Sequence, residues 1–119
     1  PDPRRAVDGF VDEWFRLLIE DDWYRQSFEI LLNKTELTDA MVRTIRRERE
    51  ITRAIVTTLG ARIHELAPAG DADAGSLGLL CYTFLMGITQ SWLFAPQLFS
   101  LAERRAFFTA RLERMLGLA

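Results

Sequence analysis

Apolar side chains recur along the chain at the three- and four-residue spacing of amphipathic helices, and no stretch alternates between apolar and polar positions as a strand would. This spacing predicts helices over residues 3–20, 22–34, 38–66, 72–94 and 101–116. The segments between them contain no hairpin dipeptide, and the chain shows no internal repeat. The pattern therefore predicts an all-α domain built from five helices.

Several residues at the predicted helix ends are types that commonly cap helices. Asp22 is placed to cap the second helix. Ser100 and Glu103 have the spacing of a capping box before the last apolar run. Gly117 stands where a glycine in the left-handed conformation ends a helix. These signals support the predicted boundaries.

The predicted helix over 72–94 is apolar nearly all round, and no charged residue occurs from Ala74 to Ala102. A membrane span is one reading of such a stretch. Against it, the stretch contains glycine, threonine, glutamine, serine and proline, its most apolar part covers only residues 77–88, and no basic flank marks a cytoplasmic side. A helix buried on two sides is the expected arrangement, with no membrane involved, and a partner subunit is one way to supply the cover.

Length and charge fit a single domain over residues 1–119. The net charge of −2 provides no global basic field for nucleic acid. Cys81 is the only cysteine, so no internal disulfide forms, and a cytoplasmic location is expected. Arginine residues between 43 and 53 alternate with Glu48 and Glu50, a pattern typical of a solvated, mixed-charge helix face.

Catalytic chemistry has little support in the sequence. His64 is the only histidine, and no positioned nucleophile with an acid–base partner is evident. The glycines match neither a P-loop nor a dinucleotide fingerprint. We therefore expect no enzyme activity, no cofactor and no metal site.

Aromatic residues are concentrated on the predicted inward faces of three helices. They are Phe10, Trp14, Phe28, Tyr82, Phe84 and Trp92. Two readings stay open: a packed core, or a cavity lined by aromatic rings with a few polar groups, as in many small-molecule sites. Thr83, Thr89, Gln90 and Ser91 lie in the same apolar helix and are candidates for those polar groups.

Two segments resemble motifs of one protein family. Residues 87–101, GITQSWLFAPQLFSL, resemble the penultimate-helix signature of AcrR-like repressors of the TetR family. Residues 29–41, EILLNKTELTDAM, resemble the stretch that joins two helices of the ligand domain in that family. With the long helix between them, the two matches make the resemblance cover essentially the whole chain.

The resemblance implies the C-terminal regulatory domain of a TetR-type transcription factor. In that family the domain binds lipophilic small molecules, and its last two helices form a four-helix bundle with a second copy. An N-terminal helix-turn-helix domain binds operator DNA, and that domain is expected to be absent from this chain. Operator DNA would therefore be reached only through the missing domain.

The resemblance also places candidate site residues on this sequence. Effector-binding positions fall at Val7, Phe10, Val11, Trp14, Phe28, Leu32, Ile55, Leu59, Tyr82, Leu85, Met86 and Thr89, with Gln90 added as a polar handle. Homodimer-interface positions fall at Leu80, Phe84, Ile88, Leu101, Phe108, Leu112 and Met115.

The expected function is that of a repressor whose operator affinity falls when a lipophilic effector binds, with an efflux pump as the controlled gene. Two alternatives remain open on the sequence. One is a stand-alone helical carrier of an apolar ligand, and the other is a dimerisation module with a solid core. An enzyme is a more distant possibility.

Overall fold

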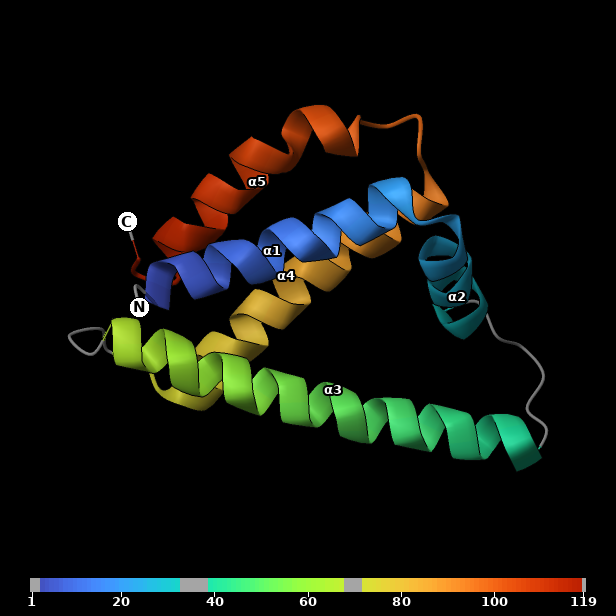
Figure 1. Ribbon diagram of the computed structural model, residues 1–119, viewed down its shortest axis with the longest axis horizontal. Coiled ribbons are helices and arrows are strands. Elements are labelled where there is room, and N and C mark those ends of the chain that lie inside the picture. The colour runs from blue at the N-terminus through green and yellow to red at the C-terminus, as the bar shows by residue number, and fades with distance from the viewer. Residues whose placement is uncertain (1–2, 33–38, 68–71, 119) are drawn as a thin grey trace.

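The computed structural model describes residues 3–32, 39–67 and 72–118, and over these residues it contains five helices and no strand (Figure 1). The helices are α1 (Pro3–Glu20), α2 (Asp22–Leu32), α3 (Asp39–Leu66), α4 (Ala74–Phe94) and α5 (Leu101–Met115). The predicted all-α class is confirmed. Within the described residues the helix bounds lie within two residues of those predicted from the spacing, and residues 33, 34 and 38 of the predicted helices lie outside the described part of the chain.

The cap of α2 differs from the prediction by one residue. The backbone N–H of Tyr24 donates to Oδ1 of Asp21 at 3.1 Å, so Asp21 is the capping residue. Asp22 already lies inside the helix, and its carboxylate pairs with Arg25 one turn later. The cause is the very short connection, because α2 begins only two residues after α1 ends.

Both ends of α5 are formed as the sequence predicts. The hydroxyl of Ser100 accepts a hydrogen bond from the backbone N–H of Glu103 at 3.2 Å. At the other end Gly117 has a φ of 77°, and the N–H of Leu118 donates to the carbonyl of Glu113 at 2.8 Å. This is the Schellman arrangement that glycine favours, because a left-handed residue without a Cβ is unstrained.

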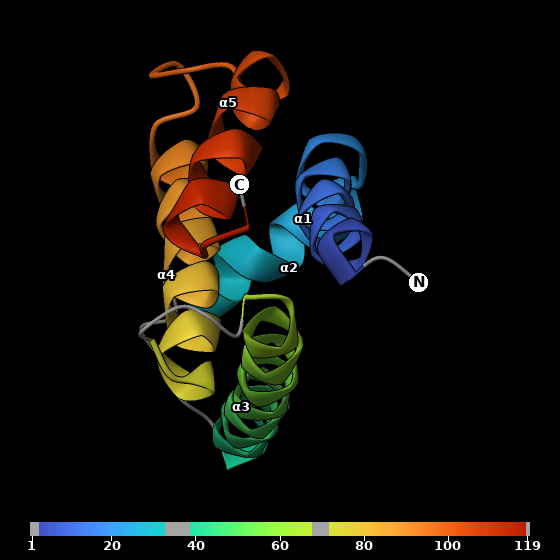
Figure 2. The same cartoon turned by 90° about the vertical axis from the view of Figure 1, so that its left-hand side faces the viewer.

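The four longer helices surround a common core. Viewed end-on, α1 and α4 lie on opposite sides, with α5 and α3 between them at top and bottom (Figure 2). α1 contacts α2, α3 and α5, and α4 contacts α3 and α5. The core side chains come from all four of these helices and from the segment after α5: Val7, Val11, Phe15, Leu18, Leu59, Ile63, Leu77, Cys81, Leu85, Ile88, Leu101, Leu112 and Leu116.

α3 and α4 approach each other closely through two glycines. A Cβ placed on Gly60 would lie 2.1 Å from the carbonyl oxygen of Ala74, and one on Gly78 would lie 2.3 Å from that of Val56. Both distances are far below van der Waals contact. The backbones of the two helices therefore meet directly, as small residues allow.

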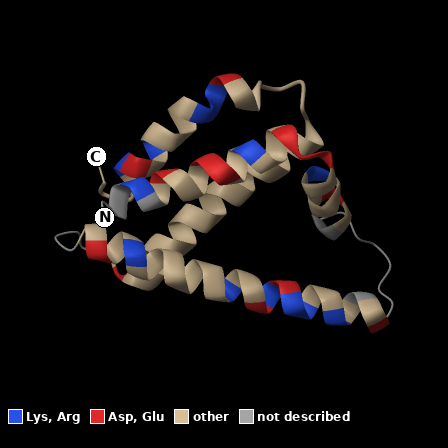
Figure 3. Cartoon of the chain, in the orientation of Figure 1, with Lys and Arg blue, Asp and Glu red and all other residues tan. Residues whose placement is uncertain are grey.

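The first turns of α3 project past α2 (Figure 1). Its side chains are nearly all exposed from Asp39 to Ile51 where the structure describes them. Basic and acidic residues alternate along it (Figure 3). This half of α3 is the solvated, mixed-charge face that the sequence predicts.

α4 is not covered on every side in the single chain. Leu79, Leu80 and Phe94 are 56%, 37% and 91% exposed. Among the described residues α4 is the one helix long and apolar enough to cross a membrane, and about a third of its most apolar window is buried. The chain is compatible with a soluble globular protein in which α4 keeps one apolar face open.

Candidate ligand-binding site

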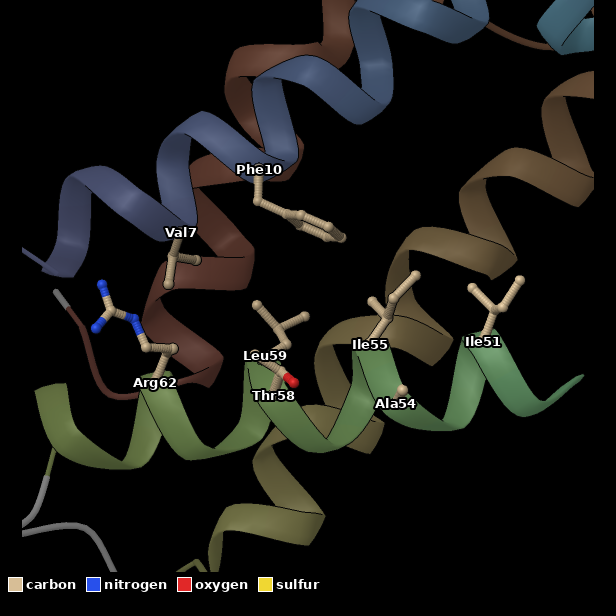
Figure 4. Close-up of a pocket in the computed structure, with 8 residues that line it drawn as sticks. All are labelled: Val7, Phe10, Ile51, Ala54, Ile55, Thr58, Leu59 and Arg62. Carbon is tan, nitrogen blue, oxygen red and sulfur yellow. The ribbon is translucent and has the colours of Figure 1, made fainter. Parts of the chain in front are cut away.

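A groove of about 490 Å³ runs between α1 and α3 (Figure 4). We call it the α1–α3 groove. It is lined by Val7, Phe10, Ile51, Ala54, Ile55, Thr58, Leu59 and Arg62. The side chains of Val7 and Phe10 point from α1 toward α3, and Arg62 closes one end. Most of this lining is apolar, which suits a hydrophobic molecule.

A second hollow of about 320 Å³ adjoins the groove, and we call it the aromatic pocket. It is lined by Trp14, Tyr24, Ser27, Phe28, Glu48, Ile51, Thr52, Ile55, Tyr82 and Met86. Ile51 and Ile55 belong to both hollows, so the two form one continuous surface along α3. Together they offer space for an elongated molecule.

Trp14 is the centre of the aromatic cluster. Its ring lies 5.9 Å from that of Phe10, 6.0 Å from that of Phe28 and 6.4 Å from that of Tyr82. These separations lie in the range of favourable aromatic pairs. The cluster therefore combines the packed core and the aromatic-lined cavity that the sequence left open, because the rings pack on one another and also border open space.

A hydrogen bond between α1 and α4 fixes the position of Trp14. Its Nε1–H donates to Oγ1 of Thr89 at 2.9 Å. The Thr89 hydroxyl in turn donates to the carbonyl of Leu85 at 2.7 Å, and the Thr89 residue is fully buried. Because both polar groups of this pair find partners, the bond holds the tryptophan at the wall of the pocket at little desolvation cost.

The two ends of the continuous surface carry opposite charges. Glu48 lies in the aromatic pocket, and Arg62 lies at the far end of the groove. Arg62 is paired with Glu65 at 3.7 Å, a weak pair because both side chains are at least half exposed. Burial raises the pKa of the Tyr24 phenol, so this ring stays neutral in the pocket wall.

The predicted effector positions fall into two groups. Those that line the hollows are Val7, Phe10, Trp14, Phe28, Ile55, Leu59, Tyr82 and Met86. Val11, Leu85 and Thr89 are instead packed in the core, at 1%, 0% and 0% exposure. The side chain of Leu32 lies outside the described residues.

Gln90, the expected polar handle, lies outside both hollows. Its side chain is exposed. The Trp14–Thr89 bond fixes the rotation of α4, and the next residue along a helix is turned by about 100° from it. Thr83 and Ser91 are likewise exposed, and the aromatic pocket takes polar groups from Ser27 of α2, Glu48 and Thr52 of α3 and the phenol of Tyr82 of α4.

The predicted dimer positions also divide between surface and core. Leu80 and Met115 are 37% and 44% exposed, and Phe84 and Phe108 are half-buried with their rings 6.3 Å apart. Ile88, Leu101 and Leu112 are buried within the single chain, at 9%, 1% and 1% exposure. In the single chain these three belong to the core: the α5 stripe that carries Leu101 and Leu112 packs inward, and Ile88 of α4 packs in the same cluster.

Sequence reasoning missed several residues that line the hollows. They are Tyr24, Ser27, Glu48, Ile51, Thr52, Ala54, Thr58 and Arg62. A usable signal was present for part of this set, because Ile51, Ile55, Thr58 and Arg62 follow the spacing of one helix face.

No protein-family model matches the chain, and no curated protein or solved structure matches it significantly. Among the described residues no group of three or more histidine, cysteine, aspartate or glutamate side chains is arranged to hold a metal ion. The geometry of the two hollows is therefore the main guide to function.

Proposed function

We propose that this chain is the effector-binding and dimerisation domain of a TetR/AcrR-type transcription regulator. The observation that carries the proposal is the continuous apolar surface formed by the α1–α3 groove and the aromatic pocket. Its combined space, its aromatic walls and its few polar groups are the usual features of a small-molecule site. The segments 29–41 and 87–101, which resemble the family, support the same reading.

The effector in this proposal is a lipophilic small molecule. Phe10, Ile51 and Ile55 offer apolar contact along the groove, and Met86 can adapt its shape to different ligands in the aromatic pocket. Such a lining contains few fixed polar partners, so it favours broad tolerance over narrow selectivity. Tolerance of this kind suits a regulator of an efflux pump.

The second part of the proposal is a homodimer through α4 and α5. Leu79, Leu80 and Phe94 leave an uncharged apolar face on α4, and α5 adds exposed Phe107 and Met115. Exposed apolar side chains gathered on one helix face are typical of an interaction surface. A second copy would cover it by forming a four-helix bundle around a two-fold axis.

Ligand binding would be coupled to DNA through α1. In this proposal a molecule seated in the groove changes the spacing between α1 and α3, and a DNA-binding domain joined to α1 would move with that helix. In a dimer, two such shifts move two DNA-reading heads away from their half-sites. By linkage, operator binding must weaken effector binding by the same factor.

The ligand part is tested by titrating lipophilic compounds, both neutral and charged, while recording tryptophan fluorescence and melting temperature. We expect saturable quenching together with a raised melting temperature, because a ligand that binds only the native state stabilises it. Phe28→Ala should weaken the response, whereas Trp23→Phe should not, since Trp23 is 78% exposed and lines neither hollow. A flat response to a broad panel would favour a dimerisation module without a sensor function.

The dimer part is tested by light scattering on the intact chain. Leu80→Glu is expected to convert a dimer into a monomer, because an unpaired carboxylate in an apolar interface is strongly unfavourable. Ile30→Glu is the matched control, since Ile30 is 60% exposed on α2, away from this face. A monomeric parent chain that binds ligand would favour the carrier reading instead.

A further inference from the structure

The face of α3 that borders the groove ends in a charged residue, Arg62, at a position where the helical spacing of apolar residues would predict an apolar side chain. Ile51, Ile55, Thr58 and Arg62 lie at positions i, i+4, i+7 and i+11, which share one side of a helix. Figure 4 shows the Arg62 side chain directed toward α1 at the end of the groove. A guanidinium group therefore stands at the end of an apolar channel.

Arg62 retains most of its capacity to bind an anion. Its only ion pair among the described residues is with Glu65 at 3.7 Å, and the side chains are 50% and 64% exposed. A guanidinium offers five N–H donors, and a carboxylate ligand can use two of them at once. Exchange of the weak pair with Glu65 for a two-point bond to a ligand is therefore favourable.

Thr58 provides a second donor beside Arg62. The hydroxyls of Thr83, Thr89 and Thr109 each donate to the carbonyl four residues earlier in their helices. The Thr58 hydroxyl makes no such bond and has no other hydrogen-bond partner within the described part of the chain, although it lines the groove. This hydroxyl is thus available to a ligand.

We propose that the α1–α3 groove selects a free amphiphile with an anionic head, such as a long-chain carboxylate. The head binds Arg62 and Thr58, and the chain lies along Ile55, Ile51 and Phe10. The distance from Arg62 to Ile51 along α3 is about 16 Å, a length that suits an extended alkyl chain. This inference rests on the proposed function, because it takes the groove as part of the effector site.

Glu48 fixes the direction of the ligand. It lies in the aromatic pocket, about 21 Å from Arg62 along the helix. Its carboxylate forms no hydrogen bond or ion pair with another residue in the described part of the chain. Among the side chains that line the two hollows, the cationic one is Arg62 and the anionic one is Glu48, so the orientation with the anionic head at Arg62 is favoured.

The test uses three ligands that share one dodecyl chain and differ in the head: dodecanoate, dodecanol and dodecyltrimethylammonium. Each is titrated into the intact chain below its micelle concentration, and binding is followed by calorimetry. We expect dodecanoate to bind about tenfold more tightly than dodecanol, the factor that one charge-assisted contact on a half-exposed arginine supplies. The cation should bind no more tightly than the alcohol.

Variants locate the effect at Arg62. Arg62→Gln should lower the affinity for dodecanoate about tenfold and leave that for dodecanol unchanged. Arg62→Lys should give a smaller loss, because it keeps the charge without the two-point geometry. Arg53→Gln is the control, since Arg53 is exposed on the opposite side of the same helix.

The outcomes separate this inference from the proposed function. Equal binding of dodecanoate and dodecanol, or tightest binding of the cation, would overturn the anionic-head assignment while leaving a small-molecule site in place. Sedimentation with phosphatidylglycerol vesicles that depends on Arg62 would also overturn it, by showing a lipid surface as the anionic partner. Failure of all three ligands to bind to a folded chain would overturn this inference, and the proposed function would fail with it only if the broad panel of lipophilic compounds also gives no response.

Discussion

Replacement of Gly78 by alanine tests the close contact between α3 and α4. In a helix interior this change normally stabilises a protein, because alanine loses less conformational freedom than glycine on folding. Here the added Cβ would lie 2.3 Å from the carbonyl oxygen of Val56 and 3.0 Å from Cα of Gly60. Both neighbours are backbone atoms, which cannot rotate away as a flexible side chain would.

The expected cost follows from this geometry. Restoring an ordinary contact of 3.4 Å requires the two helices to separate by about 1 Å, which loosens the packing of Leu59, Leu77 and Cys81 around the crossing. Overpacking of this kind costs about 3 kcal/mol, and the helix gain of about 1 kcal/mol leaves a net loss of roughly 2 kcal/mol. For a chain of this size the melting temperature should fall by roughly 8 °C.

The assay is thermal and urea unfolding at one fixed protein concentration, so that any self-association affects all variants equally. Gly9→Ala is the matched control, because Gly9 lies in α1 and a Cβ added there would meet no atom within 4 Å. It should raise stability by up to about 1 kcal/mol. If Gly78→Ala also raises the melting temperature, the helices do not meet as closely as described, and the reasoning fails.

Three further predictions concern buried or capping groups. Thr89→Val should lower the free energy of unfolding by about 1–2 kcal/mol, because it leaves the indole N–H of Trp14 without an acceptor. A double-mutant cycle with Trp14→Phe should show that the two sites are coupled, and additive effects would argue against the bond. Cys81 is fully buried, and burial raises the pKa of its thiol to about 12. The native protein should therefore resist thiol reagents at about pH 8 and react fully on unfolding. Rapid labelling of the native protein would contradict this. Hydrogen bonds from Ser76 lower the pKa of the Asp73 carboxyl, so its stabilising effect is present above the unfolded pKa of about 3.9 and is lost as the pH falls below it. The stability advantage over Asp73→Asn, measured by urea unfolding, should therefore shrink on acidification, and an advantage that persists at low pH would refute the role of the charge.

The helices could be predicted from the sequence because their signals are local. The serine N-cap at Ser100 and the glycine at 117 act within one turn of the residues they join, and the structure contains both. The spacing of apolar residues likewise depends only on the helix period. Asp21 replaced Asp22 as the cap of α2 because the link to α1 is so short that both aspartates were plausible.

The sides of the helices were harder to predict, because they depend on how one helix is rotated against another. The bond from Trp14 to Thr89 turns Gln90 toward solvent, and no local pattern signals that bond. Leu101 and Leu112 form an apolar stripe whose spacing fits a dimer interface or a core equally well. In the structure α5 packs against α1, and both leucines are buried in the core. Arg62 was not predicted as a lining residue, because an arginine in a helix is normally assigned to the solvent-exposed surface.

The central claim is that a small molecule binds along α3 beside Trp14. The most direct test is a nitrogen–proton correlation spectrum that follows the three tryptophan indole N–H signals, assigned by single Trp→Phe variants, during titration with dodecanoate. Trp14 lines the aromatic pocket, whereas Trp23 is 78% exposed and lines neither hollow. We expect a saturable shift of the Trp14 signal, whereas the Trp23 signal should stay in place. An unchanged Trp14 signal with dodecanoate and with a broad panel of other lipophilic compounds would contradict it.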